Sequence, residues 1–215
     1  MADVIERLSS CYVAVIHDVM WGMGERDFVM PSDLAALERG QTLCGPAFTI
    51  TGDLKPGTDP DQTLRAWTQL LSAAKPGHVW VCQPNTQDIA LMGELSAETL
   101  NYRGVLGCVI DGGLRDAEFI LKLGFPVWHR FRTPLDVNGQ WLPTAIDEPI
   151  RIGTVWIRPG DLIVADFDGV VRVPAAIAEE VADRAVEARD TESEVRKAIL
   201  SGVDPVEAFD RYGKF

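Results

Sequence analysis

The sequence predicts a single α/β domain with a mixed parallel and antiparallel sheet and a long C-terminal helix. Three observations predict this class. Short apolar runs alternate with helical segments through residues 44–131, which is typical of parallel or mixed sheets covered by helices. Residues 135–173 hold short alternating runs separated by turn residues, which indicates antiparallel hairpins. Residues 175–200 are rich in Ala, Glu and Arg with a 3.6-residue apolar period, which indicates one amphipathic helix.

Length and composition favour one domain over two. With 215 residues, 47% of them hydrophobic, the chain is long enough for one well-packed domain over residues 1–215. No stretch approaches the length of a membrane span, and the N-terminal residues lack the apolar core of a signal peptide. We therefore expect a cytoplasmic protein without a membrane partner.

The net charge indicates which partners are excluded, and the cysteine spacing indicates the redox state of the thiols. The formal net charge is -12 and no Lys/Arg cluster occurs, so we expect no direct nucleic-acid binding, which needs a basic surface. The four cysteines are widely spaced without a C-x-x-C pair, and most sit in apolar runs. We expect buried, reduced thiols. They are Cys11, Cys44, Cys82 and Cys108.

The N-terminal 40 residues are predicted to be mainly helical. Residues 2–9 have helical spacing, whereas the apolar positions of residues 12–20 fit a strand or a helix. Within them, His17 and Asp18 could form a general base, but no nucleophile is near, and we favour a hydrogen-bonded pair. Residues 21–33 are predicted to form a loop.

The middle of the chain alternates strands and helices. The strand at 44–51 is expected to end at Gly52-Asp53, and Asp59-Pro-Asp61 is expected to cap the next helix. The further elements follow from apolar periodicity and turn residues. We expect helices at 62–74, 95–102 and 116–123, and strands at 78–82, 107–111 and 127–131.

The C-terminal third begins with hairpins and ends in helices. Asp168-Gly169 between two β-branched runs predicts a hairpin with strands at 162–166 and 170–173. Pro174 suits a helix start, and Gly202 ends the long helix. A short terminal helix is predicted at 205–212.

The chain is organised around residues 93–116. Gly93 breaks an apolar run, and the N–H groups of the helix start at Leu95 and Ser96 are suited to hold an anion. Asp111-Gly112-Gly113 is read as a turn that delivers Arg115 and Asp116 at the carboxyl end of a strand. A guanidinium can grip a carboxylate while an acidic side chain holds a hard divalent metal, so this combination predicts a site for a small keto-acid.

The spacing Glu94, twenty residues, Arg115-Asp116 resembles the acid-x20-Arg-Asp signature of the RraA-like family. The likeness extends over roughly residues 10 to 185. Further stretches that carry it are 45–50 (GPAFTI), 75–77 (KPG), 158–166 (RPGDLIVAD) and 168–174 (DGVVRVP). The resemblance implies a layered α/β/β/α fold like that of swivelling domains, and it favours a helix over residues 14–21.

The resemblance also implies an activity. The family includes class II aldolases that act on 4-hydroxy-4-methyl-2-oxoglutarate and 4-carboxy-4-hydroxy-2-oxoadipate, and regulators of ribonuclease E. It implies a lyase that releases pyruvate from a 4-hydroxy-2-oxo diacid and decarboxylates oxaloacetate. Asp116 would hold Mg²⁺ or Mn²⁺ or another divalent metal, Arg115 would be catalytic and bind substrate, and Glu94 would relay a proton. Gly93, Leu95 and Ser96 would complete the substrate site.

The resemblance implies a homotrimer or homohexamer, in which residues 1–40 and 175–215 would pack against neighbouring subunits. Some family aldolases place a C-terminal acid in the neighbour's site, for which Glu192 and Glu194 are candidates here. The chain has Glu94 where the well-characterised aldolases have Asp, which would move the proton relay by one methylene. Residues 21–28 have no counterpart that we can place in the family.

Other interpretations remain open for the same residues. Arg115-Asp116 could be a surface ion pair with Asp116 capping its own helix. The negative charge of Glu94 could simply stabilise the positive end of a helix dipole. His129, Arg130 and Arg132 could meet a second substrate carboxylate or be surface charges. The alternative function is a non-catalytic regulator whose acidic surface docks on basic partner segments.

Overall fold

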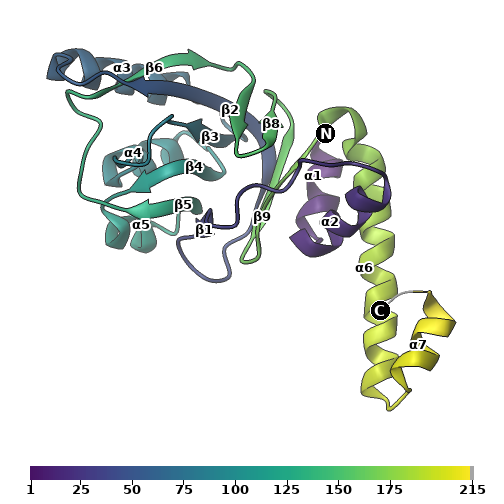
Figure 1. Ribbon diagram of the computed structural model, residues 1–215. Coiled ribbons are helices and arrows are strands. Elements are labelled where there is room, and N and C mark those ends of the chain that lie inside the picture. The colour runs from purple at the N-terminus through teal and green to yellow at the C-terminus, as the bar shows by residue number, and fades with distance from the viewer. Residues whose placement is uncertain (214–215) are drawn as a thin grey trace.

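Four parallel strands form the centre of the fold, which we describe from a computed structural model covering residues 1–213 (Figure 1). They lie in the order β5-β4-β3-β2, so each chain-adjacent pair is also adjacent in the sheet. This arrangement places the carboxyl ends of all four at one edge. They are β2 (Leu43–Leu54), β3 (Val79–Gln83), β4 (Gly107–Leu114) and β5 (Val127–Arg132).

Antiparallel strands extend the sheet on both sides. β1 (Ala35–Ala36) pairs with β5. The first part of β2 pairs with β9 (Leu162–Asp166), and its second part pairs with β6 (Trp141–Ile146). β10 (Gly169–Val173) pairs with β9 through the predicted Asp168-Gly169 hairpin. A separate hairpin consists of β7 (Ile150–Ile152) and β8 (Val155–Ile157).

The helices lie in two groups on the outside of the strands (Figure 1). Helices α3 (Pro60–Ala73), α4 (Glu94–Tyr102) and α5 (Ala117–Leu123) cover one face of the parallel strands over a core that includes Trp67, Trp80 and Trp141. On the far side, α1 (Ala2–Ser9), α2 (Val13–Gly22) and α6 (Ala178–Leu200) pack on β9 and β10. A third core, with Trp128, fills the space between the parallel strands and the β7–β10 strands.

The molecule is therefore a mixed α/β domain whose sheet curls until it is nearly closed. From one side of the molecule to the other, the layers are helices, parallel strands, antiparallel strands and helices. This order agrees with the expected α/β/β/α fold. The long C-terminal helix α6 follows a short 3₁₀ turn (Ala175–Ile177), extends beyond the body, and is followed by α7 (Pro205–Tyr212), which turns back along it (Figure 1). All predicted helices and strands occur.

Two predicted chain breaks are wrong, and one strand was missed. β2 does not end at Gly52-Asp53 but continues to Leu54, because a bulge between Thr51 and Gly52 lets the strand bend and pair with β6. Likewise Asp111-Gly112-Gly113 is not a turn: β4 runs to Leu114 through an irregularity between Ile110 and Gly113. The missed strand β1 has two residues, Ala35 and Ala36, too few for a recognisable pattern.

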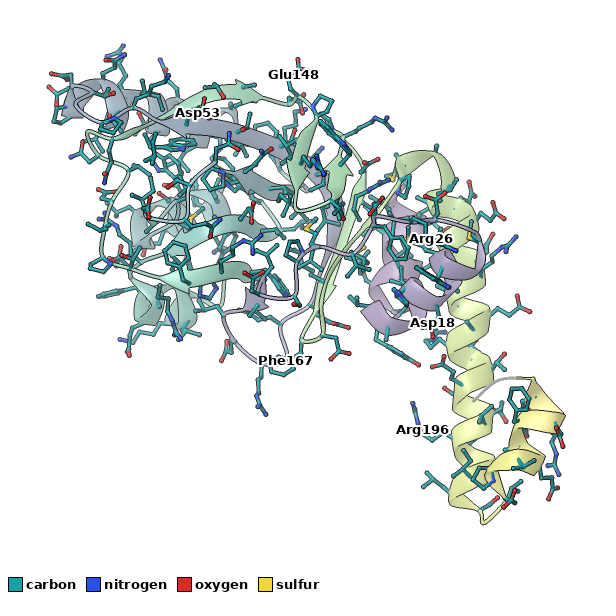
Figure 2. All side chains as sticks on the ribbon, in the orientation of Figure 1. Asp18, Arg26, Asp53, Glu148, Phe167 and Arg196 are labelled. Carbon is teal, nitrogen blue, oxygen red and sulfur yellow. The ribbon has the colours of Figure 1, made fainter. Side chains whose placement is uncertain are left out.

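Among the labelled surface residues, Asp53 lies near the end of β2, Glu148 lies between β6 and β7, and Phe167 lies in the turn between β9 and β10 (Figure 2). Three of the four cysteines are buried, Cys44 is partly buried, and all four are free thiols. Burial raises the pKa of the Cys108 and Cys82 thiols well above the usual value. Within residues 1–213, we find no helix long and apolar enough to cross a membrane.

Candidate functional site

Two segments far apart in sequence meet at the carboxyl end of β4. Residues 89–92 run beside the end of β4, where Leu91 N–H donates to Gly113 O (2.9 Å) and Arg115 N–H donates to Met92 O (2.9 Å). Gly113 is required at this crossing, because a Cβ there would come within 2.6 Å of Ile89 O. The pairing brings Gly93, where α4 begins, next to Arg115 and Asp116.

Asp116 caps the helix that starts at Gly93. The Asp116 Oδ2 atom accepts a hydrogen bond from Glu94 N–H (3.2 Å), the first amide of α4. Asp116 precedes α5, yet makes no side-chain cap of that helix. Of the alternative interpretation, the partly exposed Arg115–Asp116 ion pair is present. The cap of α5 by its own Asp116 side chain is not, because this carboxylate accepts from the first amide of the other helix.

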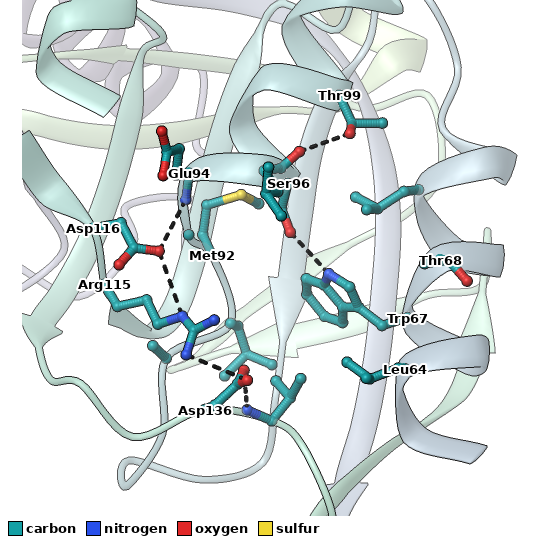
Figure 3. A pocket seen from close by; sticks show the side chains of 16 residues that line it. Leu64, Trp67, Thr68, Met92, Glu94, Ser96, Thr99, Arg115, Asp116 and Asp136 are labelled. Atoms are coloured by element: carbon teal, nitrogen blue, oxygen red, sulfur yellow. Dashed lines mark hydrogen bonds and ion pairs between the residues drawn. The ribbon is translucent and has the colours of Figure 1, made fainter. Parts of the chain in front are cut away.

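Arg115 lies between two carboxylates. Its Nε atom is 3.5 Å from Asp116 Oδ2, and its Nη1 atom is 3.3 Å from Asp136 Oδ2 (Figure 3). Asp136 is in turn oriented by Val137 N–H, which donates to its Oδ1 atom (2.7 Å). The side chains of Arg115 and Asp116 keep 37% and 39% of their exposure, so both remain accessible to a ligand.

These groups line one side of a cavity of about 460 Å³. The other side is formed by α3, whose Leu64 and Trp67 face the charged groups across the cavity (Figure 3). Trp67 is fixed in place, because its Nε1–H donates to Ser96 Oγ (2.9 Å). The cavity thus has a charged side at the β4–α4 junction and a largely apolar side on α3.

The free carboxylate oxygen of Asp116 is the type of ligand that a hard divalent metal takes. Oδ2 of Asp116 is engaged by Glu94 N–H and faces Arg115, whereas Oδ1 makes no hydrogen bond or ion pair within the described residues. Residues 1–213 hold no group of three or more His, Cys, Asp or Glu side chains able to hold an ion. Mg²⁺ fits this set, because it keeps most of its waters and binds through one or two carboxylates, whereas Zn²⁺ needs more protein ligands.

The structure brings together all six residues that the sequence analysis singled out for the site. They are Gly93, Glu94, Leu95, Ser96, Arg115 and Asp116, and all line the cavity. Sequence reasoning missed Asp136, which lies in the loop after β5. No sequence signal tied this acid to Arg115, because the contact depends on the path of the loop.

The remaining candidates lie elsewhere. Arg130 is paired with Asp111 and Asp33 and does not line the cavity, so it holds β4, β5 and the N-terminal segment together. Arg132 lines an adjoining hollow of about 290 Å³ that also contacts Arg115 and Asp116. His129 is buried in β5, and burial together with the nearby Arg132 charge lowers its pKa to about 4.

Two further pairs of candidates are distant from the cavity. His17 Nδ1 is 2.9 Å from Asp18 Oδ1 on α2, and the imidazole packs against Trp21 and Phe28. This geometry fits the favoured interpretation as a hydrogen-bonded pair. On α6, Glu194 binds Lys197, and Glu192 lines a hollow between α2 and α6. Neither acid is among the residues that line the cavity at Arg115.

The fold and the site define a class of protein: a nearly closed mixed α/β domain in which a guanidinium, carboxylates and a helix N-terminus meet at one cavity. Comparison with known proteins specifies the family. The Aldolase/RraA family, described as RraA-like, matches residues 13–172, and the chain belongs to this family.

Relatives of known sequence support this assignment. Protein DlpA of Legionella pneumophila is 26% identical over 213 residues, which are 99% of this chain, and the chain spans about a third (34%) of the length of DlpA. A protein of Halalkalibacterium halodurans, provisionally named a 4-hydroxy-4-methyl-2-oxoglutarate aldolase, is 28% identical over 96% of this chain and 93% of its own.

Solved structures agree on the fold. An uncharacterised protein of Pseudomonas syringae superposes with a TM-score of 0.88 at 27% identity over 99% of this chain and 95% of its own. Streptomyces coelicolor RraAS2, described as an unusual member of the RNase ES inhibitor RraA protein family, superposes with a TM-score of 0.81 at 29% identity, covering 91% and 96% of the two chains.

Proposed function

We propose that this protein is a divalent-metal-dependent carbon–carbon lyase that cleaves a pyruvyl-containing 4-hydroxy-2-oxo acid to pyruvate and a second carbonyl compound. Oxaloacetate decarboxylation would be its side activity. Two relatives provisionally named 4-hydroxy-4-methyl-2-oxoglutarate aldolases support a 4-hydroxy-2-oxo acid as the substrate class. One observation carries the proposal: the hydrogen bond from Glu94 N–H to Asp116 Oδ2 joins the α4 N-terminus, Arg115 and the candidate metal ligand at one cavity.

Binding of the keto-acid head follows from this geometry. Arg115 would donate charge-assisted hydrogen bonds to the carboxylate. The N–H groups of Leu95 and Ser96 lie in the first turn of α4, where amides have no intrahelical acceptor, and the helix N-terminus favours an anion. Asp116 would hold Mg²⁺ or Mn²⁺, which supplies a Lewis acid for the keto oxygen when bound.

Cleavage would move one proton and one electron pair. Glu94 takes the proton of the C4 hydroxyl, directly or through one water, as a general base. The C4 oxygen then forms a carbonyl, the C3–C4 bond breaks, and its electrons give the enolate of pyruvate. Arg115 lies beside the developing negative charge, where a preorganised cation lowers the barrier most. Return of a proton to C3 yields pyruvate.

The test compares pyruvate release from oxaloacetate, with and without Mg²⁺, in four proteins. Arg115→Ala should lower the metal-dependent rate by roughly 10²- to 10³-fold, as expected for a transition-state charge donor. Asp116→Asn keeps an acceptor for Glu94 N–H but loses the charge, so it should abolish stimulation by Mg²⁺ while the fold persists. Arg184→Ala, which removes an exposed pair with Glu180 on α6, is the matched control and should retain the rate of the unmodified protein.

A non-catalytic regulator is the second candidate. The net charge of -12 and the likeness to an RNase ES inhibitor family member favour it. Such a protein would bind a basic partner segment with an affinity that falls steeply with salt. If the purified protein gives no metal-dependent pyruvate release above background, the lyase proposal fails and the regulator gains.

A further inference from the structure

The distal wall of the cavity is apolar and rigid. Leu64, Trp67 and Leu71 of α3 line it, together with Leu95 of α4. The Trp67 indole has its N–H satisfied by Ser96 Oγ, and the ring is packed edge-on against Trp80 and Trp141 at centroid distances of 6.3 and 5.9 Å. Thr68 and Thr99 also line the cavity, but their hydroxyls donate to backbone carbonyls of their own helices. The wall that a ligand meets therefore offers mainly hydrocarbon and no cation.

The charges of the cavity are all on the opposite side. Its lining contains one cation, Arg115, and three carboxylates, those of Glu94, Asp116 and Asp136. The keto-acid head would occupy Arg115 and the metal site. A second carboxylate reaching α3 would lose water without gaining a cation, which is unfavourable.

The cavity has space beyond the keto-acid group of the substrate. A cavity of about 460 Å³ lies within the range of small-molecule sites and exceeds what a pyruvyl group fills. At its rim, Leu64 is 43% and Leu95 is 76% exposed, so both offer apolar surface that a ligand would cover. Burial of that surface and of an apolar substrate branch would be favourable together.

We propose that the fragment released beside pyruvate is an uncharged aliphatic or aromatic aldehyde or ketone, held against Trp67 and Leu64. The substrate class is then 4-hydroxy-2-oxo monoacids with an apolar branch at C4, in place of diacids. This inference rests on the proposed function, because it assumes that the keto-acid head binds at Arg115, and it narrows the substrate class of that site.

Arg132 is the cation that could bind the second carboxylate of a diacid substrate. This residue lines the adjoining hollow with Arg115 and Asp116 and is absent from the lining of the main cavity. A diacid that used Arg132 would bind away from the α3 wall. The two arrangements therefore respond differently to changes at Leu64 and at Arg132.

The experiment measures binding by calorimetry in the presence of Mg²⁺, independently of turnover. Three ligands are compared: pyruvate, 2-oxoglutarate, and 5-methyl-2-oxohexanoate, in which an isopropyl group replaces the distal carboxylate of 2-oxoglutarate. Each buried methylene is worth roughly a fourfold gain. We expect 5-methyl-2-oxohexanoate to bind about tenfold or more tighter than pyruvate, and 2-oxoglutarate to bind no tighter than pyruvate.

Three variants test whether the α3 wall determines which ligand binds more tightly. Leu64→Lys adds a cation to the exposed rim and should raise the affinity for 2-oxoglutarate about tenfold while weakening that for 5-methyl-2-oxohexanoate. Gln69→Lys adds the same charge to the same helix at an exposed position that faces a different hollow, beside Pro143 and Ile146, and should change neither affinity. Arg132→Ala should leave the order of the three ligands unchanged.

Each contrary outcome overturns the inference. It fails if 2-oxoglutarate binds the unmodified protein as tightly as its isopropyl analogue, or if Arg132→Ala selectively weakens 2-oxoglutarate. It also fails if neither longer ligand binds more tightly than pyruvate. Oxaloacetate decarboxylation tests the proposed function separately, because oxaloacetate carries no branch that reaches α3.

Discussion

At the junction of β4 and α4, Gly93 leaves space for the charged side chains of the site. Gly93 has an extended backbone (φ −145°), which any residue adopts, so its requirement for glycine comes from space rather than from conformation. A Cβ at this position would come within 2.7 Å of Asp116 Oδ2 and 3.2 Å of Arg115 Nε. The absence of a side chain lets the two charged groups approach the helix start.

Gly93→Ala should therefore impair the site more than the fold. The added methyl would displace the Asp116 carboxylate and the Arg115 guanidinium, so we expect the rate of oxaloacetate decarboxylation to fall by about tenfold or more, while the free energy of unfolding changes by less than about 1 kcal/mol. Enzyme assays and urea titration measure the two effects. Gly22→Ala is the matched control, because a Cβ there meets no atom within 4 Å. Equal loss of stability in both variants with retained activity would contradict the steric account.

Among the charged residues that line the cavity, three share a motif and Asp136 does not. Glu94, Arg115 and Asp116 stand at a spacing that can be recognised in sequence, and the structure places all three at one cavity. Asp136 contacts Arg115 from a loop 21 residues further along the chain, and this contact depends on backbone geometry that spacing does not encode.

At the scale of elements, helices were easier to predict than strand ends. The apolar face and the Asp59 cap define α3 from sequence, and the structure has Asp59 Oδ1 accepting from Gln62 N–H (3.1 Å). Glycine and aspartate at 52–53 and 111–113 resemble turns, but tertiary pairing keeps both segments within long strands. Bulges and turns use the same residue types, so only the neighbouring strand distinguishes them.

The cap of α3 provides a test at this scale. Asp59→Ala removes the acceptor for Gln62 N–H and should lower the free energy of unfolding by about 1 kcal/mol. Asp59→Asn retains a capping oxygen and should cost much less, so the pair separates capping from charge. Urea titration at pH 7 is the measurement. Equal losses in the two variants would assign the effect to the charge at the helix N-terminus instead.

For the whole molecule, topology explains why distant segments form one site. The parallel order β5-β4-β3-β2 brings the carboxyl ends of neighbouring strands to a common edge, where the segment after β3 reaches α4 and the segment after β4 delivers Arg115. The alternation of strands and helices predicted parallel or mixed sheet. The near closure of the sheet could not be predicted in this way, because β2 pairs with β6 and β9 through residues that are 87 to 122 positions apart in the sequence.

Closure of the sheet also buries a titratable group, which makes stability depend on pH. His129 lies in β5 opposite Ala35 of β1, and its Nδ1 atom has no hydrogen-bond partner within the described residues. Burial, with the Arg132 charge as a second cause, lowers the pKa of His129 to about 4, below its usual value of 6.5. Above pH 6.5 the imidazole is neutral in both the folded and the unfolded chain and adds no pH dependence.

Between pH 6.5 and about 4 the unfolded chain binds a proton that the folded chain does not, so the free energy of unfolding should fall as the pH falls. The loss from this group is at most about 3 kcal/mol and is complete just below pH 4. Asp111 acts with the opposite sign near pH 4, because burial raises the pKa of its carboxyl despite its bond to Arg130. The contribution of His129 is therefore the difference between the unmodified protein and His129→Gln, measured by urea titration from pH 7.5 to 4. Between pH 6.5 and 4 the unmodified protein should lose up to about 3 kcal/mol more than His129→Gln. Curves that stay parallel over the whole range would show that His129 is protonated as readily in the folded chain as in the unfolded one.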